Sequence, residues 1–591
     1  MRYMASAGDY EVDKPGRLIM RAARLSHGLK WRLIGALLMT LLATIVRLLG
    51  PLVVRGGIDE GIEKSDKEVI LLAGAIFVGL LVVQYIVSAL SEWMVTHVGE
   101  EYLKQLRSVV FKRMLRLDMA FFSRSKSGVL VSRMTADIES LQEFASDGAV
   151  MALGNLLTVV GVAIALVLVD WQMALAVFAV VGVLLLVTVV FQRQARKAYD
   201  MVRERIGQVL GALQEGITGV RVVQAFTQEP TQAATFGRVN EKYFDANMAA
   251  ARAISWYFPV VAFLRVVAMV AALAIGTARV IDGTMTIGTL VAFLLYLDWF
   301  FQPIINLSNV YNLLQSALAA LAKLFQLMDE PIAVSDRPDA IDLETLAEGA
   351  VRFDDVAFSY IKGTTVLEDI DLDIKPGERV AIVGETGSGK STIAKLAMRF
   401  YDPDSGAVSL DGSNLKDVTE VSRAETLALI PQDAFLFSGT LRDNLKYAAQ
   451  DASDEDVRRI LDVMGLTAWV SELPDGLDTE VRERGSRFSA GERQLVSLAR
   501  AFMADPSVIV LDEATSNLDP ETETDVERAL SALLADRTAI VIAHRLKSAE
   551  RADRVVLVDR GHILAKGTHA ELVSSSPPYR ELVDVWQRGL A

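Results

Sequence analysis

The sequence predicts an all-α transmembrane domain of six helices, with long cytoplasmic helical extensions, fused to an α/β domain. Hydrophobic residues make up 52% of the 591 residues, which is high for a wholly soluble chain. Apolar runs long enough to span a bilayer occur only up to about Leu307. Beyond a change of composition near Met328, short β-rich runs alternate with helical stretches, as in α/β domains with a largely parallel sheet.

The membrane half contains six apolar runs. A helix rises ~1.5 Å per residue, so ~20 apolar residues cross ~30 Å of hydrocarbon. The runs are Leu33–Val54, Ile70–Leu90, Val150–Val169, Met173–Phe191, Ile254–Thr277 and Ile287–Leu307.

The distribution of basic residues predicts which side of the membrane each loop occupies. The two long connections carry many Lys and Arg residues, whereas the short connection Asp170–Gln172 carries none. Positive loops stay in the cytoplasm, so we expect the long loops, the N-terminus and the C-terminal half on the cytoplasmic side of the cell (inner) membrane. Residues 1–29 contain a basic amphipathic stretch with Arg17, Arg21 and Arg24, which we expect to lie along that surface.

The long loops have helical apolar periodicity, for example at Val109, Val110 and Met114. We therefore expect the membrane helices to extend into the cytoplasm and to reverse at short turns near Ser125–Gly128 and Gly216–Gly219. A separate soluble domain inserted twice is the less economical alternative.

An acidic, proline-punctuated segment separates the two halves. The expected division is an N-terminal elbow at 1–29, a transmembrane domain at 30–327, a linker at 328–348 and a C-terminal α/β domain at 349–591. The chain has no cysteine, which excludes disulfides and thiolate metal sites. The formal net charge of −14 argues against nucleic acid as a partner.

A glycine-rich loop follows the apolar strand Arg379–Val383 and precedes a predicted helix, Thr392–Tyr401. Such a loop lets backbone N–H groups wrap the phosphates of ATP at a helix N-terminus. Lys390 would contact the β- and γ-phosphates, and Ser391 would bind Mg²⁺. The loop consists of Gly384, Glu385, Thr386, Gly387, Ser388, Gly389, Lys390, Ser391 and Thr392.

The apolar run Ser507–Leu511 is followed by two carboxylates, Asp512 and Glu513. At the end of a buried strand downstream of a phosphate loop, Asp512 is expected to hold Mg²⁺. Glu513 is expected to polarise the water that attacks the γ-phosphate.

With these motifs in this order, nearly the whole chain resembles a half-transporter of the ATP-binding cassette (ABC) exporter family. The resemblance implies that Tyr360 stacks on adenine and that Gln432 contacts Mg²⁺ and the attacking water. It implies that His544 contacts the γ-phosphate and that Ser516 and Asp519 lie in the loop across the dimer seam. It also implies that the turns of the two intracellular loops dock on the cassette near Gln432.

The signature segment departs from the family pattern, which is usually LSGGQ. Here Ser489 and Gly491 are kept, whereas Ala490 and Glu492 replace a glycine and a glutamine. In the family this segment completes the partner's ATP site, so Ala490 would add a methyl group and Glu492 a possible negative charge near the partner's nucleotide. An intact hydrolytic set beside an altered signature favours a heterodimer with a second ABC half-transporter, although a homodimer that tolerates the changes is the alternative.

Three charged residues fall in or near the apolar runs: Arg47, Arg265 and Asp298. An unpaired charge there is costly, so we expect them to face the bundle interior or a wet cavity, with Arg265 and Asp298 as a possible pair that is either structural or in contact with substrate. The resemblance implies ATP-driven export or flipping of an amphipathic drug, lipid or peptide by alternating access, with ATP and Mg²⁺ as cofactors. An importer of exporter fold and a non-transporting sensor ATPase remain alternatives.

Overall fold

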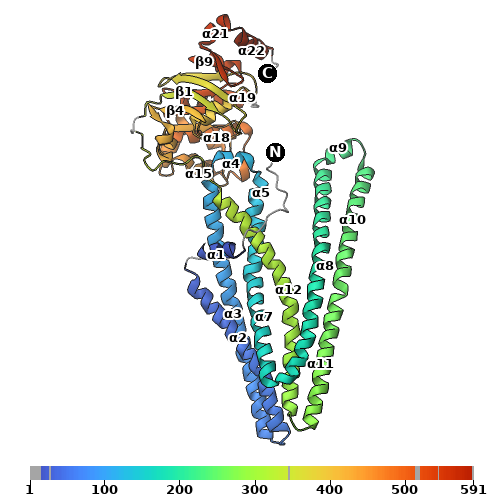
Figure 1. Cartoon of the computed structure of the whole chain (residues 1–591). Helices are drawn as coiled ribbons and strands as arrows, with labels where there is room; N and C mark the ends of the chain where they lie inside the picture. Colours follow the sequence, from blue (N-terminus) through green and yellow to red (C-terminus); the bar gives the residue numbers. More distant parts are fainter. Residues whose placement is uncertain (1–14, 26–27, 344–346, 513–519, 544, 589–591) are drawn as a thin grey trace. The chain divides into compact units, whose positions relative to one another are not determined.

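The computed structural model describes residues 15–25, 28–343, 347–512, 520–543 and 545–588 (Figure 1). The chain divides into two compact units. One unit comprises the residues up to Met114 together with Gly128–Asp329, and the other comprises Leu115–Ser127 together with Glu330–Ala591. Each unit is described by itself below.

The first unit is helical. Among the described residues, six helical stretches are long and apolar enough to cross a membrane, which confirms the predicted fold class. The helices are α1 (Pro15–Leu25), α2 (Lys30–Gly56), η1 (Gly57–Ile62), α3 (Lys67–Leu115), α5 (Ser127–Ser132), η2 (Arg133–Asp137), α6 (Ile138–Glu143), η3 (Phe144–Gly148), α7 (Ala149–Val169), α8 (Trp171–Thr218), α9 (Val220–Ala225), α10 (Glu229–Ser255), α11 (Tyr257–Ile281) and α12 (Ile287–Asp329).

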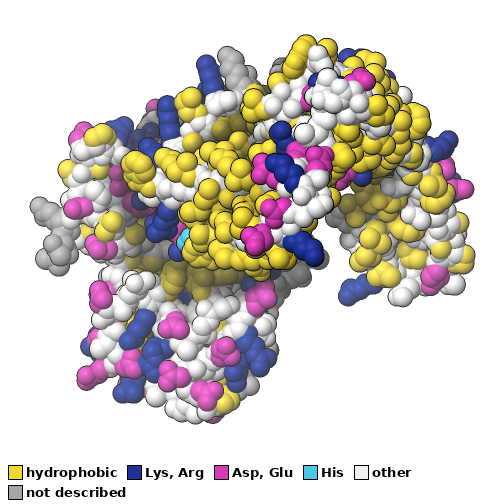
Figure 2. Space-filling view, turned by 90° about the horizontal axis from the view of Figure 1, so that it is seen from below, with side chains coloured by type: hydrophobic (Ala, Val, Ile, Leu, Met, Phe, Trp, Pro, Cys, Tyr) yellow, Lys and Arg dark blue, Asp and Glu magenta, His cyan; other side chains and the backbone are white. Residues whose placement is uncertain are grey.

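Large apolar side chains remain exposed on these helices. On α3, for example, Leu71 and Tyr85 are 74% and 76% exposed. Figure 2 shows broad areas covered by hydrophobic side chains. Exposed apolar area on this scale is unfavourable in water and expected where lipid is the solvent.

Polar contacts fix the ends of the membrane helices that lie away from the long loops. Asp170 caps α8 by accepting hydrogen bonds from the backbone N–H groups of Gln172 and Met173, at 3.1 and 3.0 Å. The same carboxylate pairs with Arg279 near the end of α11, at 2.5 Å. Asp59 accepts a hydrogen bond from the backbone N–H of Gly288 at the start of α12, at 2.7 Å.

The long loops are helical arms, as predicted, but short helices rather than simple turns reverse the chain. At the tip of the α8–α10 hairpin, α9 makes the reversal (Figure 1). Val222 and Phe226 at this tip are 62% and 71% exposed. In the other loop the short helix is α4 (Met119–Arg124), which begins where Asp118 accepts a hydrogen bond from the backbone N–H of Phe121.

The second unit contains two sheets. A six-stranded sheet has the order β10-β9-β3-β8-β7-β6 and is parallel except at β10, and an antiparallel sheet has the order β2-β1-β4-β5. The antiparallel sheet was not anticipated from the sequence. The strands are β1 (Val351–Phe358), β2 (Leu367–Ile374), β3 (Arg379–Val383), β4 (Ser405–Leu410), β5 (Ser413–Asn414), β6 (Leu427–Ile430), β7 (Val508–Asp512), β8 (Thr538–Ile542), β9 (Arg554–Asp559) and β10 (His562–Gly567).

The two largest apolar clusters among the described residues of this unit cover the two faces of the parallel sheet. One lies between the two sheets around the helix that follows the glycine-rich loop, and the other packs the opposite face of the parallel sheet against α18 and α19. The helices are α13 (Lys390–Ala397), α14 (Glu420–Thr426), α15 (Leu441–Leu445), α16 (Asp454–Val463), α17 (Thr467–Glu472), α18 (Ala490–Met503), α19 (Pro520–Leu533), α20 (Leu546–Glu550), α21 (His569–Ser575) and α22 (Pro577–Gln587), with short η4 (Leu415–Asp417), η5 (Lys446–Ala448), η6 (Gly476–Asp478) and η7 (Glu483–Gly485).

The short helix α4 belongs to this second unit. Ala120 packs against the core between the two sheets. Asp118 accepts a hydrogen bond from the backbone N–H of Ala333, at 2.8 Å. The tip of the first long loop is therefore part of the α/β unit.

Candidate active site

The parallel sheet brings the glycine-rich loop, Gln432 and Asp512 to the carboxyl ends of its strands. Strands β3, β8, β7 and β6 run in the same direction, so the loops that follow them leave the sheet on the same side. The glycine-rich loop follows β3, Asp512 ends β7, and Gln432 lies two residues beyond β6. Residues that are far apart in sequence thus converge on the carboxyl ends of neighbouring strands.

Two glycines of the loop are required by its backbone. Gly384 has φ +150°, and a Cβ there would lie 2.0 Å from the carbonyl oxygen of Val558. Gly389 has φ +111°, and its Cβ would lie 2.6 Å from Leu367 Cδ2. Any side chain at either position would strain the backbone or displace a neighbouring strand.

The loop holds polar groups suited to a phosphate chain. Lys390 is only 4% exposed, and its Nζ donates to the carbonyl oxygens of Gly384 and Glu385, at 2.8 Å each. The hydroxyl of Ser388 is buried with no hydrogen-bond partner among the described residues. These groups and the glycine cradle fit the phosphates of ATP at the start of α13.

Helix α13 differs from its predicted bounds of Thr392–Tyr401. It begins at Lys390 and ends at Ala397. The helix cannot continue because Arg399 adopts φ +49°, a left-handed conformation that breaks the helical hydrogen-bond pattern. The glycine-rich loop therefore leads directly into the first helical turn.

The aromatic side chain of Tyr360 lies beside the loop. Tyr360 donates to or accepts from Thr392 Oγ1 at 3.1 Å, and Lys395 Nζ lies 5.5 Å from the Tyr360 ring centroid. The exposed part of this ring offers a surface on which a base can stack. The adjoining hollow, of about 720 Å³ including open solvent, is lined by Tyr360, Val366, Thr386, Gly387, Gly389, Lys390, Ser391, Thr392 and Lys395.

The donor set also suits a magnesium ion. Ser391 lies in the first turn of α13 and offers a hydroxyl, Asp512 offers a carboxylate, and Gln432 offers an amide oxygen. Mg²⁺ prefers such oxygen ligands and is commonly shared between one or two protein groups and substrate phosphates.

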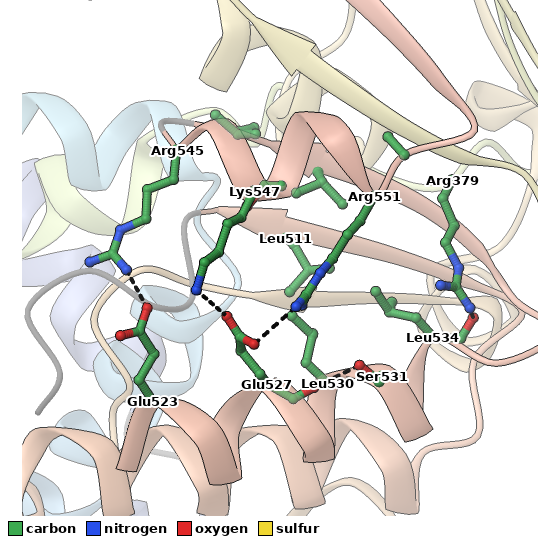
Figure 3. A pocket seen from close by; sticks show the side chains of 14 residues that line it. Arg379, Leu511, Glu523, Glu527, Leu530, Ser531, Leu534, Arg545, Lys547 and Arg551 are labelled. Atoms are coloured by element: carbon green, nitrogen blue, oxygen red, sulfur yellow. Dashed lines mark hydrogen bonds and ion pairs between the residues drawn. The ribbon is translucent and has the colours of Figure 1, made fainter. Parts of the chain in front are cut away.

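Four predicted site residues lie outside the described part of the chain: Glu513, Ser516, Asp519 and His544. The elements beside them are joined by ion pairs across a hollow between α19 and α20 (Figure 3). Arg545 pairs with Glu523 at 2.7 Å, and Arg551 pairs with Glu527 at 3.1 Å. These contacts hold α19 against α20.

The signature segment forms the capped start of α18. Ser489 accepts a hydrogen bond from the backbone N–H of Glu492, and the Glu492 carboxylate accepts one from the backbone N–H of Ser489, at 2.7 Å. The other carboxylate oxygen accepts from the indole N–H of Trp469 on α17, at 2.9 Å. Ser489 and Ala490 are exposed and Gly491 is buried.

These contacts change the expectation for Glu492. The sequence suggested a negative charge aimed at the neighbouring nucleotide, whereas both oxygens are engaged within the chain. Burial favours the neutral acid, but the hydrogen bonds from Trp469 and Ser489 outweigh burial, so the pKa of Glu492 is lowered from its ordinary value.

Two residues near the site were missed from the sequence. Tyr401 donates to or accepts from Ser123 of α4 at 2.9 Å, and its ring centroid lies 5.2 Å from that of Tyr360. Trp469 donates a hydrogen bond to Glu492, although the two residues are 23 positions apart in the sequence. No local spacing signals either contact, because each joins elements brought together only by the fold.

In the membrane unit, Arg265 of α11 lies 2.6 Å from Asp298 of α12. Arg47 of α2 lies with its guanidinium carbon 4.9 Å from the ring centroid of Trp299 on α12. The three charged residues singled out from the sequence therefore occur at two neighbouring contacts of α12.

An ATPase core built on a glycine-rich loop, in one chain with six membrane-spanning helices, defines a membrane transporter of the ATP-binding cassette class. Residues 33–304 match the model of the ABC transporter transmembrane region, and residues 367–516 match the ABC transporter model. The chain belongs to the ABC transporter family.

Three comparisons show the extent of the similarity. The chain is 34% identical over 529 residues to an ATP-dependent lipid A-core flippase of Thiobacillus denitrificans, covering 89% of this chain and 90% of that protein. It is 35% identical over 548 residues to a multidrug efflux ATP-binding/permease protein of Mycobacterium bovis, covering 93% of this chain and 46% of that protein. The structure of a bacterial Atm1-family ABC exporter with ATP bound matches with a TM-score of 0.79 at 28% identity, covering 95% of this chain and 99% of that one.

The chain is therefore a multi-pass membrane protein of exporter fold whose ATPase activity is coupled to transport.

Proposed function

We propose that this chain is one half of a dimeric exporter that moves an amphipathic drug, lipid or peptide across the cytoplasmic membrane by alternating access. Its parts are the elbow at 1–29, the transmembrane domain at 30–327, the linker at 328–348 and the nucleotide-binding domain at 349–591. The nucleotide-binding domain and the N-terminus lie in the cytoplasm in this proposal, because the basic loops stay on that side.

The contact between α4 and the α/β unit carries the proposal. Ser123 at the tip of the first intracellular loop contacts Tyr401, Tyr401 packs against Tyr360, and Tyr360 contacts Thr392 of the glycine-rich loop. Nucleotide seated against Tyr360 would thus bear on the segment that leads to the membrane helices. ATP-driven transport requires such a connection between the nucleotide site and the membrane helices, whereas an uncoupled ATPase does not.

Two exposed features support a dimer. The signature segment presents Ser489 and Ala490 at the surface, where they can complete a partner's ATP site. The exposed apolar tip at Val222 and Phe226 offers a surface that can dock on a partner's cassette. We favour a heterodimer, because Ala490 and Glu492 alter the signature while the hydrolytic residues of this chain are kept.

The chemical roles follow from residue type and position. Glu513 would polarise the attacking water, Gln432 would orient it, and His544 would contact the γ-phosphate. Lys390 and the loop N–H groups would stabilise charge on the phosphates. A bound Mg²⁺, held by Ser391, Gln432 and Asp512, would neutralise charge that develops during phosphoryl transfer.

Transport by inverted membrane vesicles tests this proposal. Vesicles containing the chain and any half-transporter that copurifies with it should accumulate a fluorescent amphipath only when ATP is present. Lys390→Ala should abolish accumulation, because the buried ammonium group that contacts the phosphates is lost. ATP hydrolysis without movement of any amphipath would support the sensor ATPase instead, and ATP-driven depletion from the vesicles would support import.

A further inference from the structure

The charges inside the membrane segments do not balance. The six apolar runs contain two cations, Arg47 and Arg265, and one anion, Asp298, so their net charge is +1. Charged side chains at membrane depth are costly and persist where they pair or line a path for a polar group. The structure shows which of the two cations is paired.

Arg265 is the paired cation. Its Nη2 lies 2.6 Å from Asp298 Oδ1, and the two side chains are 50% and 42% exposed. Asp298 lies 11 residues from the start of α12, ~16 Å along the helix axis at ~1.5 Å per residue. A half-exposed ion pair at that depth cannot face hydrocarbon, so this side of α11 and α12 faces a polar space or a partner.

Arg47 has no carboxylate within ion-pair distance among the described residues. Its guanidinium instead lies over the Trp299 ring, adjacent in sequence to Asp298. The contact between α2 and α12 is fixed beside it, because Tyr296 donates a hydrogen bond to the carbonyl oxygen of Leu48 at 2.5 Å. Gly50 of α2 packs beside the same ring, since a Cβ there would lie in ordinary van der Waals contact with Trp299, at 3.8 Å.

We propose that Arg47 selects substrates by their charge and that the transported class is an anionic amphipath. A guanidinium whose face rests on an aromatic ring keeps its N–H edges free for a phosphate or carboxylate, which it binds in a forked geometry. Trp299 offers apolar surface beside the anion for the acyl or aromatic part of the same molecule. This inference rests on the proposed export function and names its substrate class.

In this proposal, Asp298 also sets the net charge that the substrate meets. Because Asp298 neutralises Arg265, the cluster of Arg47, Arg265 and Asp298 has one uncompensated positive charge. That charge suits one anionic group on the substrate. Removing its charge would free Arg265 and strengthen anion binding, whereas removing Arg47 would leave a cluster without net charge. The two changes therefore have opposite expected signs, which a general packing defect would not produce.

Binding of three twelve-carbon amphipaths to the purified transporter tests the assignment. The transporter, with any half that copurifies, is placed in phosphatidylcholine nanodiscs without nucleotide. Half-saturating concentrations are measured for dodecyl phosphate, dodecanoate and dodecyltrimethylammonium. Phosphatidylglycerol added to the nanodiscs distinguishes a lipid headgroup from a free amphipath, because it competes with dodecyl phosphate only if the site accepts the lipid.

Both anions should bind more tightly than the trimethylammonium compound. Arg47→Gln should raise their half-saturating concentrations by about tenfold or more, in keeping with loss of a charge-assisted hydrogen bond. Asp298→Asn should lower them. The neutral double variant Arg265→Gln/Asp298→Asn should resemble the wild type, and so should Arg55→Gln, a matched charge removal two turns along α2 from Arg47.

Equal binding of the cation, or unchanged anion binding by Arg47→Gln, would overturn the assignment. Vesicle transport separates this failure from failure of the proposed function. If ATP drives transport of amphipaths equally in the wild type and in Arg47→Gln, the export proposal holds and only the charge assignment fails. Absence of ATP-driven movement for amphipaths of either charge removes both.

Discussion

At the scale of single residues, Glu492 shows how a departure from a family pattern is accommodated locally. Its carboxylate accepts hydrogen bonds from two donors, the backbone N–H of Ser489 and the indole N–H of Trp469. A glutamine has one acceptor oxygen, so Glu492→Gln would leave one of the two donors without its partner. We expect a loss of about 1 kcal/mol in the stability of this region.

Hydrogen–deuterium exchange of peptides covering 467–492 measures this loss as faster exchange. Glu571→Gln is the matched control, because Glu571 caps α21 in the same way but, within the described part of the chain, its carboxylate accepts only from Thr568. A single acceptor oxygen is enough for the bond from Thr568, so the substitution should change exchange in α21 little. Equal effects of the two substitutions would show that charge, rather than the second acceptor, matters at Glu492.

The pH dependence of the Glu492 effect has a definite sign. Its pKa is lower in the folded chain than in the unfolded one, so its stabilising contribution is present above its ordinary carboxyl pKa of ~4.3. The contribution is lost as the pH falls through the lowered folded-state pKa. The difference in exchange between wild type and Glu492→Gln should therefore be constant near neutral pH and shrink in acid.

At the scale of elements, the sequence predicted long features better than short ones. The membrane helices and β3 and β7 have strong apolar patterns, and the structure has them close to the predicted bounds. Helices α4 and α9 have six residues each, too few for a periodic pattern to emerge. Tyr401 was assigned to the end of a helix that stops before it, so its contact with α4 could not be inferred.

The contact between α4 and Tyr401 can be tested by a double-mutant cycle. Ser123→Ala and Tyr401→Phe each remove the hydroxyl bond while leaving the Tyr401 ring against Phe358 and Tyr360. Each should reduce the stimulation of ATP hydrolysis by a transported amphipath, by about 2- to 10-fold if the bond contributes ~0.5–1.5 kcal/mol to coupling.

The double variant should be no worse than either single variant, because both remove the same bond. Ser127→Ala, at an exposed serine in the same loop, should retain full stimulation. Additive losses in the double variant would mean that the two hydroxyl groups act through different partners.

At the scale of the whole molecule, ATP hydrolysis and dimerisation depend on each other. Glu513 is proposed to act on ATP bound by this chain, while the partner's signature completes the same site. Glu513→Gln should therefore lower steady-state hydrolysis by about 10²-fold or more, as expected for loss of a general base, and should retain bound ATP in a closed dimer. Glu455→Gln, at an exposed carboxylate in the first turn of α16, is the matched control and should hydrolyse ATP normally.

The composition of that trapped dimer distinguishes the two assemblies. Two differently tagged copies of Glu513→Gln are produced together, and one tag is captured after incubation with ATP. A homodimer that assembles at random yields the captured tag and the second tag at about 2:1, whereas a heterodimer yields the captured tag and a second ABC half in equal amounts. Near-normal hydrolysis by Glu513→Gln would contradict its assigned role in either assembly. Loss of hydrolysis without ATP retention would contradict the closed dimer, because a site that cannot turn over should still bind its nucleotide across the seam.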